Sequence, residues 1–125
     1  MAKIIAKVQV RRAYDPPADD DGYRVLVDRL WPRGLSKDRA HIDEWCKALA
    51  PSTELRKWYQ HDPDLWPQFA QRYRMELSEP AAAAEIVRLQ DLAAKGPVTV
   101  LTGSKRSDIS DATVIAELLT STSVD

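Results

Sequence analysis

The sequence predicts an α/β fold: a small three-layer domain with a mainly parallel sheet of about four strands flanked by helices. The first reason is the alternation of short β-branched runs with longer segments that carry apolar residues at helical spacing. The second reason is that proline, glycine and serine interrupt the chain between these segments. The third is size, because 125 residues with 44% hydrophobic and 30% charged side chains are typical of one domain with one core. We therefore treat residues 1–125 as a single domain.

Three segments are predicted as strands, and a fourth is ambiguous. Residues 3–10 are rich in β-branched side chains, and residues 23–28 form a second apolar run. Residues 98–101 are continuously apolar, as expected for a strand that is buried on both faces. Residues 42–49 fit either a strand or a helix. We favour a strand there because Pro51 follows closely, and a residue before proline favours extended geometry.

Helices are predicted from their start and stop signals. Serine and aspartate accept hydrogen bonds from free backbone N–H groups at a helix start, and proline is tolerated at the first position. The helices are expected to begin at Ser36, Ser52, Asp62–Pro63, Pro80 and either Asp108 or Ser110, and to end near Ala40, Gln60, Leu77, Gly96 and Leu119. The Thr/Ser-rich residues after the last helix are expected to be frayed.

Composition restricts the classes of function. A net charge of −1 argues against a general nucleic-acid-binding protein, although residues 1–61 hold 12 Lys and Arg against 9 Asp and Glu. One cysteine and two histidines at no ligand spacing predict neither a disulfide framework nor a metal site. No glycine-rich dinucleotide fingerprint is present, so no cofactor is predicted.

The chain also lacks the signals of export and membrane insertion. Its first residues are interrupted by lysines, unlike a signal peptide, and no apolar stretch approaches the ~18 residues of a membrane span. A cytoplasmic protein without a membrane partner is therefore the expectation. The sequence does not fix the oligomeric state.

The residues best suited to chemistry follow the second predicted strand. Arg29 and Arg33 lie after the strand end, and Lys47 lies near the end of the ambiguous segment. Ser52 begins a helix whose free N–H groups favour an anion, and Arg56 follows one turn later. Because ligands of open α/β sheets bind past the carboxyl ends of strands, these groups predict a site for a phosphate or carboxylate.

Two alternatives to this anion site remain open. The cations could form internal ion pairs, such as Asp28 with Arg56 or Glu54 with Arg33, in a scaffold or interaction domain. The arginines could instead contact the phosphates of a nucleic acid while Trp31 stacks on a base. The other central aromatic residues have helical spacing, which favours core packing for them.

Asp28 and His61 are the candidate acid/base pair. A carboxylate and an imidazole can exchange protons near neutral pH if they share a cleft. Nothing in the sequence brings the two together, and His61 could simply precede the Asp62 cap. Whether the protein is an enzyme is therefore left open.

Taken together, these motifs resemble the YeaO-like family (domain of unknown function 488) over nearly the whole chain. The matching segments are residues 12–15, 22–34, 45–47, 50–52, 55–58, 61–62 and 69–77. The signature residues of the family map onto Arg12, Asp28, Arg29, Trp31, Arg33, Lys47, Ser52, Arg56, Trp58 and His61. The resemblance implies a small α/β domain without naming a reaction. Its polar, basic signature implies a functional anion site rather than packing alone.

The chain departs from the family pattern in one place near the last helix. Members of the family commonly carry an Asn-His-Ala step there, where this chain has Ser110-Asp111-Ala112. Any role of that histidine is therefore in doubt here, and the carboxylate of Asp111 changes the charge of this part of the proposed site. Cys46 corresponds to an aliphatic residue in the family, which implies that it belongs to the core.

Overall fold

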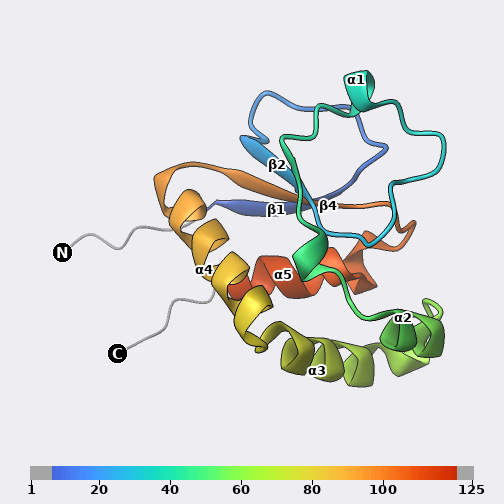
Figure 1. Cartoon of the computed structure of the whole chain (residues 1–125). Helices are drawn as coiled ribbons and strands as arrows, with labels where there is room; N and C mark the ends of the chain where they lie inside the picture. Colours follow the sequence, from blue (N-terminus) through green and yellow to red (C-terminus); the bar gives the residue numbers. More distant parts are fainter. Residues whose placement is uncertain (1–6, 121–125) are drawn as a thin grey trace.

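A computed structural model describes residues 7–120 and contains a four-stranded parallel sheet (Figure 1). The strands are β1 (Val8–Arg12), β2 (Tyr23–Leu26), β3 (Glu44–Trp45) and β4 (Val98–Thr102). Their order in the sheet is β1-β4-β2-β3, and every pairing is parallel. The predicted α/β fold with a parallel sheet of about four strands is confirmed. The first residues of the strand expected at 3–10 lie outside the described part of the chain.

The central strand is β4, which pairs with β1 on one side and β2 on the other. Val98 is in register with both Val8 and Tyr23. All five residues of β4 are buried, as the continuous apolar run predicts. The buried Thr99 hydroxyl donates to the Asp21 carbonyl (2.7 Å), so this polar group has a partner in the core.

The helices are α1 (Lys37–Ala40), α2 (Thr53–Tyr59), α3 (Trp66–Leu77), α4 (Pro80–Lys95) and α5 (Asp111–Thr120), with 3₁₀ turns η1 (Lys47–Leu49), η2 (Pro63–Leu65) and η3 (Ser107–Ile109). Helix α1 lies between β2 and β3, α2 to α4 lie between β3 and β4, and α5 follows β4, with 3₁₀ turns before α2, α3 and α5. The predicted caps at Ser36 and Ser52 are confirmed, because each side chain accepts a hydrogen bond from the N–H three residues later. None of the helices in residues 7–120 is long and apolar enough to cross a membrane.

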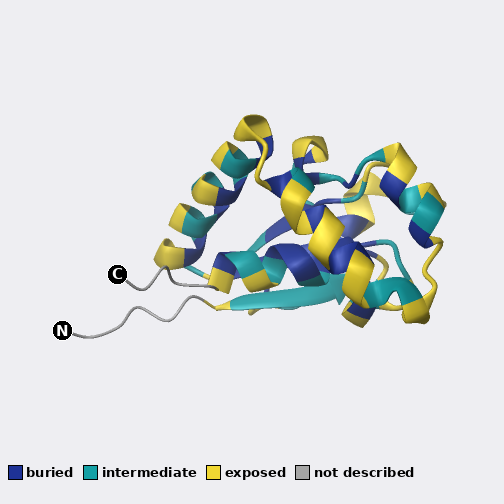
Figure 2. Cartoon of the chain, turned by 90° about the horizontal axis from the view of Figure 1, so that it is seen from below, coloured by how far each residue is buried: buried dark blue, intermediate teal, exposed yellow. Residues whose placement is uncertain are grey.

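The two faces of the sheet are covered differently (Figure 1). Helices α2 to α5 lie on one face, where α5 packs against β1 and β4, and their inward sides are buried (Figure 2). The opposite face is covered by a thinner layer that includes α1 and the loop after β2. There Leu26 and Leu101 pack against Trp31, Leu35 and Trp45. The third layer therefore consists mostly of loop, and it leaves the carboxyl ends of the strands accessible.

The ambiguous segment at 42–49 is partly strand and partly helix. Only Glu44–Trp45 pairs with β2, and the chain then turns at Cys46 into the 3₁₀ turn η1. The pairing involves only Val25 and Leu26 of β2, and β2 ends at Leu26 rather than at residue 28 as expected from the sequence. The turn directs Leu49 into the core, where it is completely buried.

Two helix boundaries also differ from the prediction. The predicted helix at Pro63 begins as the 3₁₀ turn η2, and the α-helix starts only at Trp66 with a second proline in its first turn. Gly96 follows α4 as predicted, but its φ of −179° is extended, so it does not form the left-handed cap that glycine often provides. Of the two candidate caps of the last helix, Ser110 directly precedes α5, whereas Asp108 lies within η3.

Candidate functional site

A pocket of about 240 Å³ lies at the carboxyl ends of β2 and β4, beside the first turn of α5. We call it the carboxyl-edge pocket. It is smaller than the roughly 300–1,000 Å³ of sites for drug-sized ligands, so it suits a small molecule. Its lining residues are Asp28, Arg29, Leu30, Pro51, Arg56, Tyr59, His61, Phe69, Thr102, Gly103, Ser104, Ser110 and Asp111.

Asp28 is fixed in the pocket by the end of the neighbouring strand. Its carboxylate accepts hydrogen bonds from the Gly103 N–H (2.7 Å) and the Thr102 hydroxyl (3.0 Å). Its backbone carbonyl accepts a further bond from the Trp45 indole (2.7 Å). A Cβ added at Gly103 would lie 3.4 Å from the Asp28 carboxylate, so a larger residue there would crowd this contact. The pairing of β2 with β4 therefore orients the Asp28 side chain, because it places the end of β4 beside it.

Asp111 is the second carboxyl group of the pocket and the more deeply buried one. It occupies the first position of α5, is 9% exposed, and accepts a hydrogen bond from the Ala112 N–H (2.8 Å). Burial raises its pKa well above the ordinary value, and the charge of Asp28 and a hydrogen bond with Asp28 raise it further. Folding therefore favours the neutral form of Asp111 more than water favours that of a free aspartic acid.

Two cations, Arg29 and Arg56, are among the lining residues of the pocket. Arg29 is exposed and donates to the Pro51 carbonyl (3.3 Å), while Arg56 is half-buried on α2. Across residues 7–120, no ion pair joins either guanidinium to a carboxylate. The internal pairs considered from the sequence, Asp28 with Arg56 and Glu54 with Arg33, are therefore not formed. Both pocket arginines keep donors for a ligand.

His61 reaches the pocket through an unusual backbone conformation. Gln60 and His61 both have positive φ angles, 46° and 57°, at the end of α2. Two successive left-handed residues that are not glycine are uncommon and cost stability. They turn the imidazole toward Ser104, whose Oγ lies 3.5 Å from Nδ1. The structure thus brings His61 and Asp28, the two acid/base candidates, to one pocket.

Aromatic rings form the apolar side of the pocket. The Tyr59 and Phe69 rings stack with centroids 4.2 Å apart. The Tyr59 hydroxyl donates to the Ile109 carbonyl (2.7 Å), which ties α2 to the turn before α5. Helical spacing predicts core packing for Phe69, and both rings are buried in the core. Both residues also line the pocket, although little of either side chain is exposed.

Ser52 has a structural partner at the predicted anion position. Its hydroxyl donates to Glu76 (2.6 Å), and its backbone N–H donates to the other oxygen of the same carboxylate (2.8 Å). The Ser52 oxygen also accepts the Leu55 N–H (3.1 Å) as the helix cap. The start of α2 therefore binds a carboxylate from α3, and Ser52 is not among the residues that line the pocket.

Arg12 and Arg33 lie outside the pocket lining. Arg12 donates through Nε to the Ser104 carbonyl (3.2 Å), so it supports the loop that forms one wall. Its guanidinium also lies 5.2 Å from the centroid of the Tyr14 ring. Arg33 is exposed, and its carbonyl accepts a hydrogen bond from the Tyr14 hydroxyl (2.7 Å).

Trp31 and Lys47 also lie outside the pocket lining, on the side of the sheet that carries Trp45. The Trp31 indole donates to the Leu35 carbonyl (2.8 Å), and its ring meets Trp45 edge to face at 5.5 Å. The Lys47 ammonium lies 4.1 Å from the centroid of a Trp45 ring, a cation–π contact. The structure therefore separates these two residues from Arg29 and Arg56.

The pocket contains residues that the sequence did not mark as a site. Ser104, Ser110 and Asp111 come from the loop after β4 and the start of α5. The sequence offered one usable signal, the departure from the family pattern at Ser110-Asp111, because both positions line the pocket. The turn at residues 102–105 faintly resembles a phosphate loop, but its Gly103 N–H binds Asp28.

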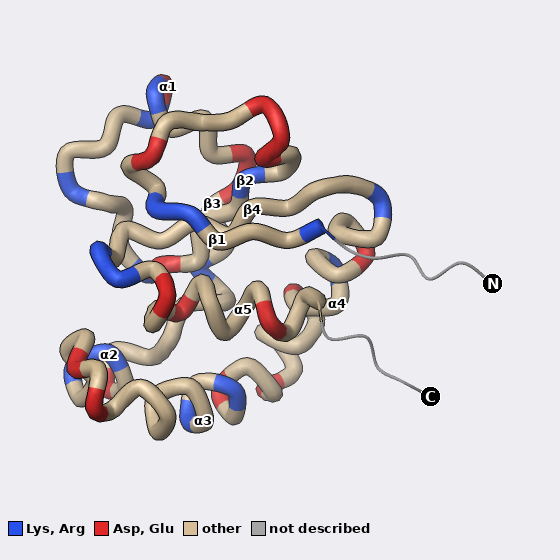
Figure 3. The backbone as a smooth tube through the Cα atoms, turned by 180° about the vertical axis from the view of Figure 1, so that it is seen from behind, with Lys and Arg blue, Asp and Glu red and all other residues tan. Residues whose placement is uncertain are grey.

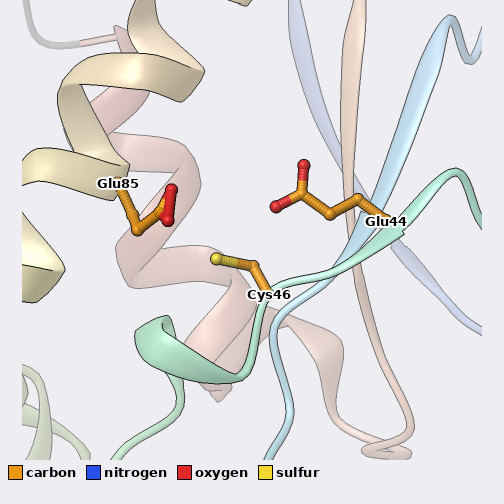
Figure 4. A group of neighbouring side chains, drawn as sticks. All are labelled: Glu44, Cys46 and Glu85. Atoms are coloured by element: carbon orange, nitrogen blue, oxygen red, sulfur yellow. The ribbon is translucent and has the colours of Figure 1, made fainter.

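A second group of polar side chains, which do not line the pocket, lies between β3 and α4. Ligand atoms of Glu44, Cys46 and Glu85 lie within 4.8 Å of one another (Figure 4). Arg88 forms ion pairs with both carboxylates, and burial raises the pKa of the Cys46 thiol to about 11. A guanidinium therefore supplies the positive charge that a metal ion would, and the group links β3 to α4. Cys46 is 5% exposed, as expected for a core residue.

A family described as the inactive DUF488-N3 subclade matches residues 7–124. The chain is similar to uncharacterized protein Rv3073c of Mycobacterium tuberculosis, with 46% identity over 90% of this chain and 93% of that protein. It is also similar to uncharacterized protein YeaO of Escherichia coli, with 42% identity over 91% of this chain and 97% of that protein. No solved structure matches the chain.

Proposed function

This chain belongs to the DUF488 family, in the subclade described as inactive DUF488-N3, and on that premise we propose that it binds a small ligand bearing a phosphate or carboxylate group. The binding site of this proposal is the carboxyl-edge pocket. The observation that carries it is the pair Arg29 and Arg56, which line the pocket without a carboxylate partner in the described residues. Arginine presents a planar fork of donors that matches the oxygens of both anions.

The position of the pocket supports the same proposal. Ligands of parallel α/β sheets bind outside the carboxyl ends of the strands, where the loops of neighbouring strands meet. Asp28 follows β2 and Gly103 follows β4, so the pocket lies between two adjacent strand ends. The surrounding rings of Tyr59 and Phe69 lower the exposure of the site to water. Lower exposure strengthens the attraction between an arginine and an anion.

We propose binding rather than turnover for this member of the family. The matching subclade is described as inactive. In this chain Ser110 and Asp111 line the pocket at positions where the family resemblance predicts asparagine and histidine. An acid in place of an imidazole changes which proton the pocket can transfer. Asp28 and His61 remain the acid/base candidates if the pocket converts a ligand.

Thermal-shift measurements with inorganic phosphate, simple carboxylates and sugar phosphates test this proposal. A ligand that binds the native state raises the unfolding temperature by mass action. We expect stabilisation of the wild type and its loss in the double variant Arg29→Gln/Arg56→Gln. The matched control is Arg74→Gln, because Arg74 lies on α3 and pairs with Glu117 at the surface.

The same experiment distinguishes the alternatives. Equal stabilisation of the wild type and the Arg29/Arg56 double variant would contradict the proposal. Loss of binding in Arg33→Gln/Lys47→Gln instead would place the anion on the wider surface predicted from the sequence. Binding of oligonucleotides that weakens steeply with salt would favour the nucleic-acid alternative. Basic and acidic residues are interspersed along the backbone (Figure 3), so the pocket is the more specific basis for a ligand.

A further inference from the structure

The carboxyl-edge pocket contains side chains of both charges. Asp111 is buried and Asp28 is half-buried, and we call these two carboxyl groups the floor, or acidic end, of the pocket. Arg56 is half-buried like Asp28, and Arg29 is exposed, so Arg29 is the most solvent-accessible of the four. A ligand that fills the pocket must therefore satisfy basic and acidic groups at once.

The acidic end excludes a second anionic group. Carboxylate and phosphate oxygens are both hydrogen-bond acceptors, so an anion placed against Asp28 would lack donors and would be repelled. The Asp28 carboxylate already accepts bonds from Thr102 and Gly103, but each carboxylate oxygen has two acceptor positions. The group that completes the floor must therefore donate hydrogen bonds.

Hydroxyl groups fit the floor better than an ammonium group. An ammonium ion is bound best by two ionised carboxylates. Asp111 is 9% exposed and shares its surroundings with Asp28, which favours the neutral acid beside one carboxylate. A neutral acid and a carboxylate together both donate and accept, which matches hydroxyl groups.

From this arrangement we infer that the ligand is a phosphorylated polyol of about monosaccharide size, with its phosphate at Arg29 and Arg56 and its hydroxyl groups at Asp28 and Asp111. The inference rests on the proposed function, because it specifies the ligand class of the same pocket. The volume of about 240 Å³ limits the ligand to this size.

Glycerol 3-phosphate and n-propyl phosphate form a matched pair of probes. Both carry the same phosphate and a three-carbon chain, but only glycerol 3-phosphate has two hydroxyl groups. We expect the wild type to bind glycerol 3-phosphate at least about tenfold more tightly by calorimetry, because buried acceptors left without donors disfavour the propyl ester. Asp111→Leu, which has a similar shape but no hydrogen-bonding group, should abolish this preference and retain binding of n-propyl phosphate.

The outcomes separate this inference from the proposed function. Equal affinities for the two esters, both lost in Arg29→Gln/Arg56→Gln, would overturn the polyol inference and leave the anion site intact. Tighter binding of 2-aminoethyl phosphate than of glycerol 3-phosphate would also overturn it, because the floor would then select an ammonium group. If none of these probes, inorganic phosphate and simple carboxylates binds, the proposed function itself is contradicted. Asp28→Ala, which leaves no hydrogen-bonding group at that position, provides a second floor variant if Asp111→Leu fails to fold, and retention of the preference in it would contradict the inference.

Discussion

Asp111 has a carboxyl group at a position with little access to water, in a pocket that already contains Asp28. Burial and the nearby carboxylate raise its pKa above that of an unfolded aspartate. The native state therefore binds a proton more tightly than the unfolded chain does. By linkage, the free energy of unfolding falls as the pH rises from about 4, the unfolded pKa, to the raised native pKa, and then levels off.

This linkage predicts that Asp111→Asn stabilises the protein at neutral pH. Asparagine has nearly the same shape as aspartate but does not ionise, so the variant avoids a buried charge that is unfavourable in the native state. Because the native pKa is raised, we expect Asp111→Asn to increase the free energy of unfolding at pH 8 and to change it much less at pH 4. Urea unfolding at pH 4 and pH 8 measures it.

The control for this prediction is Asp108→Asn. Asp108 is exposed and pairs with Arg106, and its pKa is lowered rather than raised. Asp108→Asn should therefore not stabilise the protein at pH 8. A loss of stability in Asp111→Asn at pH 8 would show that the ionised Asp111 is stabilising, contrary to the arrangement described here.

At the scale of single elements, the helix starts show what local sequence can and cannot predict. Ser36 and Ser52 were recognisable as caps because a cap depends on only three or four consecutive residues. The partner of Ser52, Glu76, lies 24 residues away on α3, and no local pattern indicates such a contact. The Glu76 carboxylate therefore occupies the position at the start of α2 where the sequence predicted a bound anion.

The contact with Glu76 leads to a prediction for Ser52→Ala. The change removes the cap of α2 and one hydrogen bond to a carboxylate, so we expect a loss of about 1–2 kcal/mol in the free energy of unfolding. We also expect affinity for phosphate probes to remain within about twofold, because Ser52 does not line the pocket. Chemical denaturation and calorimetry on the same variant measure the two effects. Thr53→Ala, at the exposed next residue, is the matched control and should change neither.

A larger loss of probe affinity in Ser52→Ala than in Thr53→Ala would indicate that Ser52 takes part in ligand binding. The sequence interpretation placed Ser52 there with Lys47 and Arg33. The structure places Lys47 on the Trp45 ring and leaves Arg33 exposed, so these residues share an edge of the sheet rather than a pocket. The positions of Lys47 and Arg33 depend on the directions of the side chains after β2 and β3. A sequence alone does not give these directions.

At the scale of the whole molecule, the fold class followed from patterns that depend on period and length. The buried strand β4 was visible as an apolar run, and α3 and α4 were visible from their helical spacing. The strand order could not be predicted, because pairing of β4 between β1 and β2 is a contact between distant segments. That order creates the pocket, since it places the loop after β4 beside Asp28. Asp111 lines the pocket for the same reason, because α5 follows the loop after β4.

The central claim is that the carboxyl-edge pocket binds an anion through Arg29 and Arg56. An NMR titration of the ¹⁵N-labelled chain with glycerol 3-phosphate tests it most directly. The account predicts saturable shifts at the Gly103 and Asp111 amides and at the side chains of Arg29 and Arg56. Shifts centred instead on Arg33, Lys47 and the start of α2, or no saturable shifts, would contradict it.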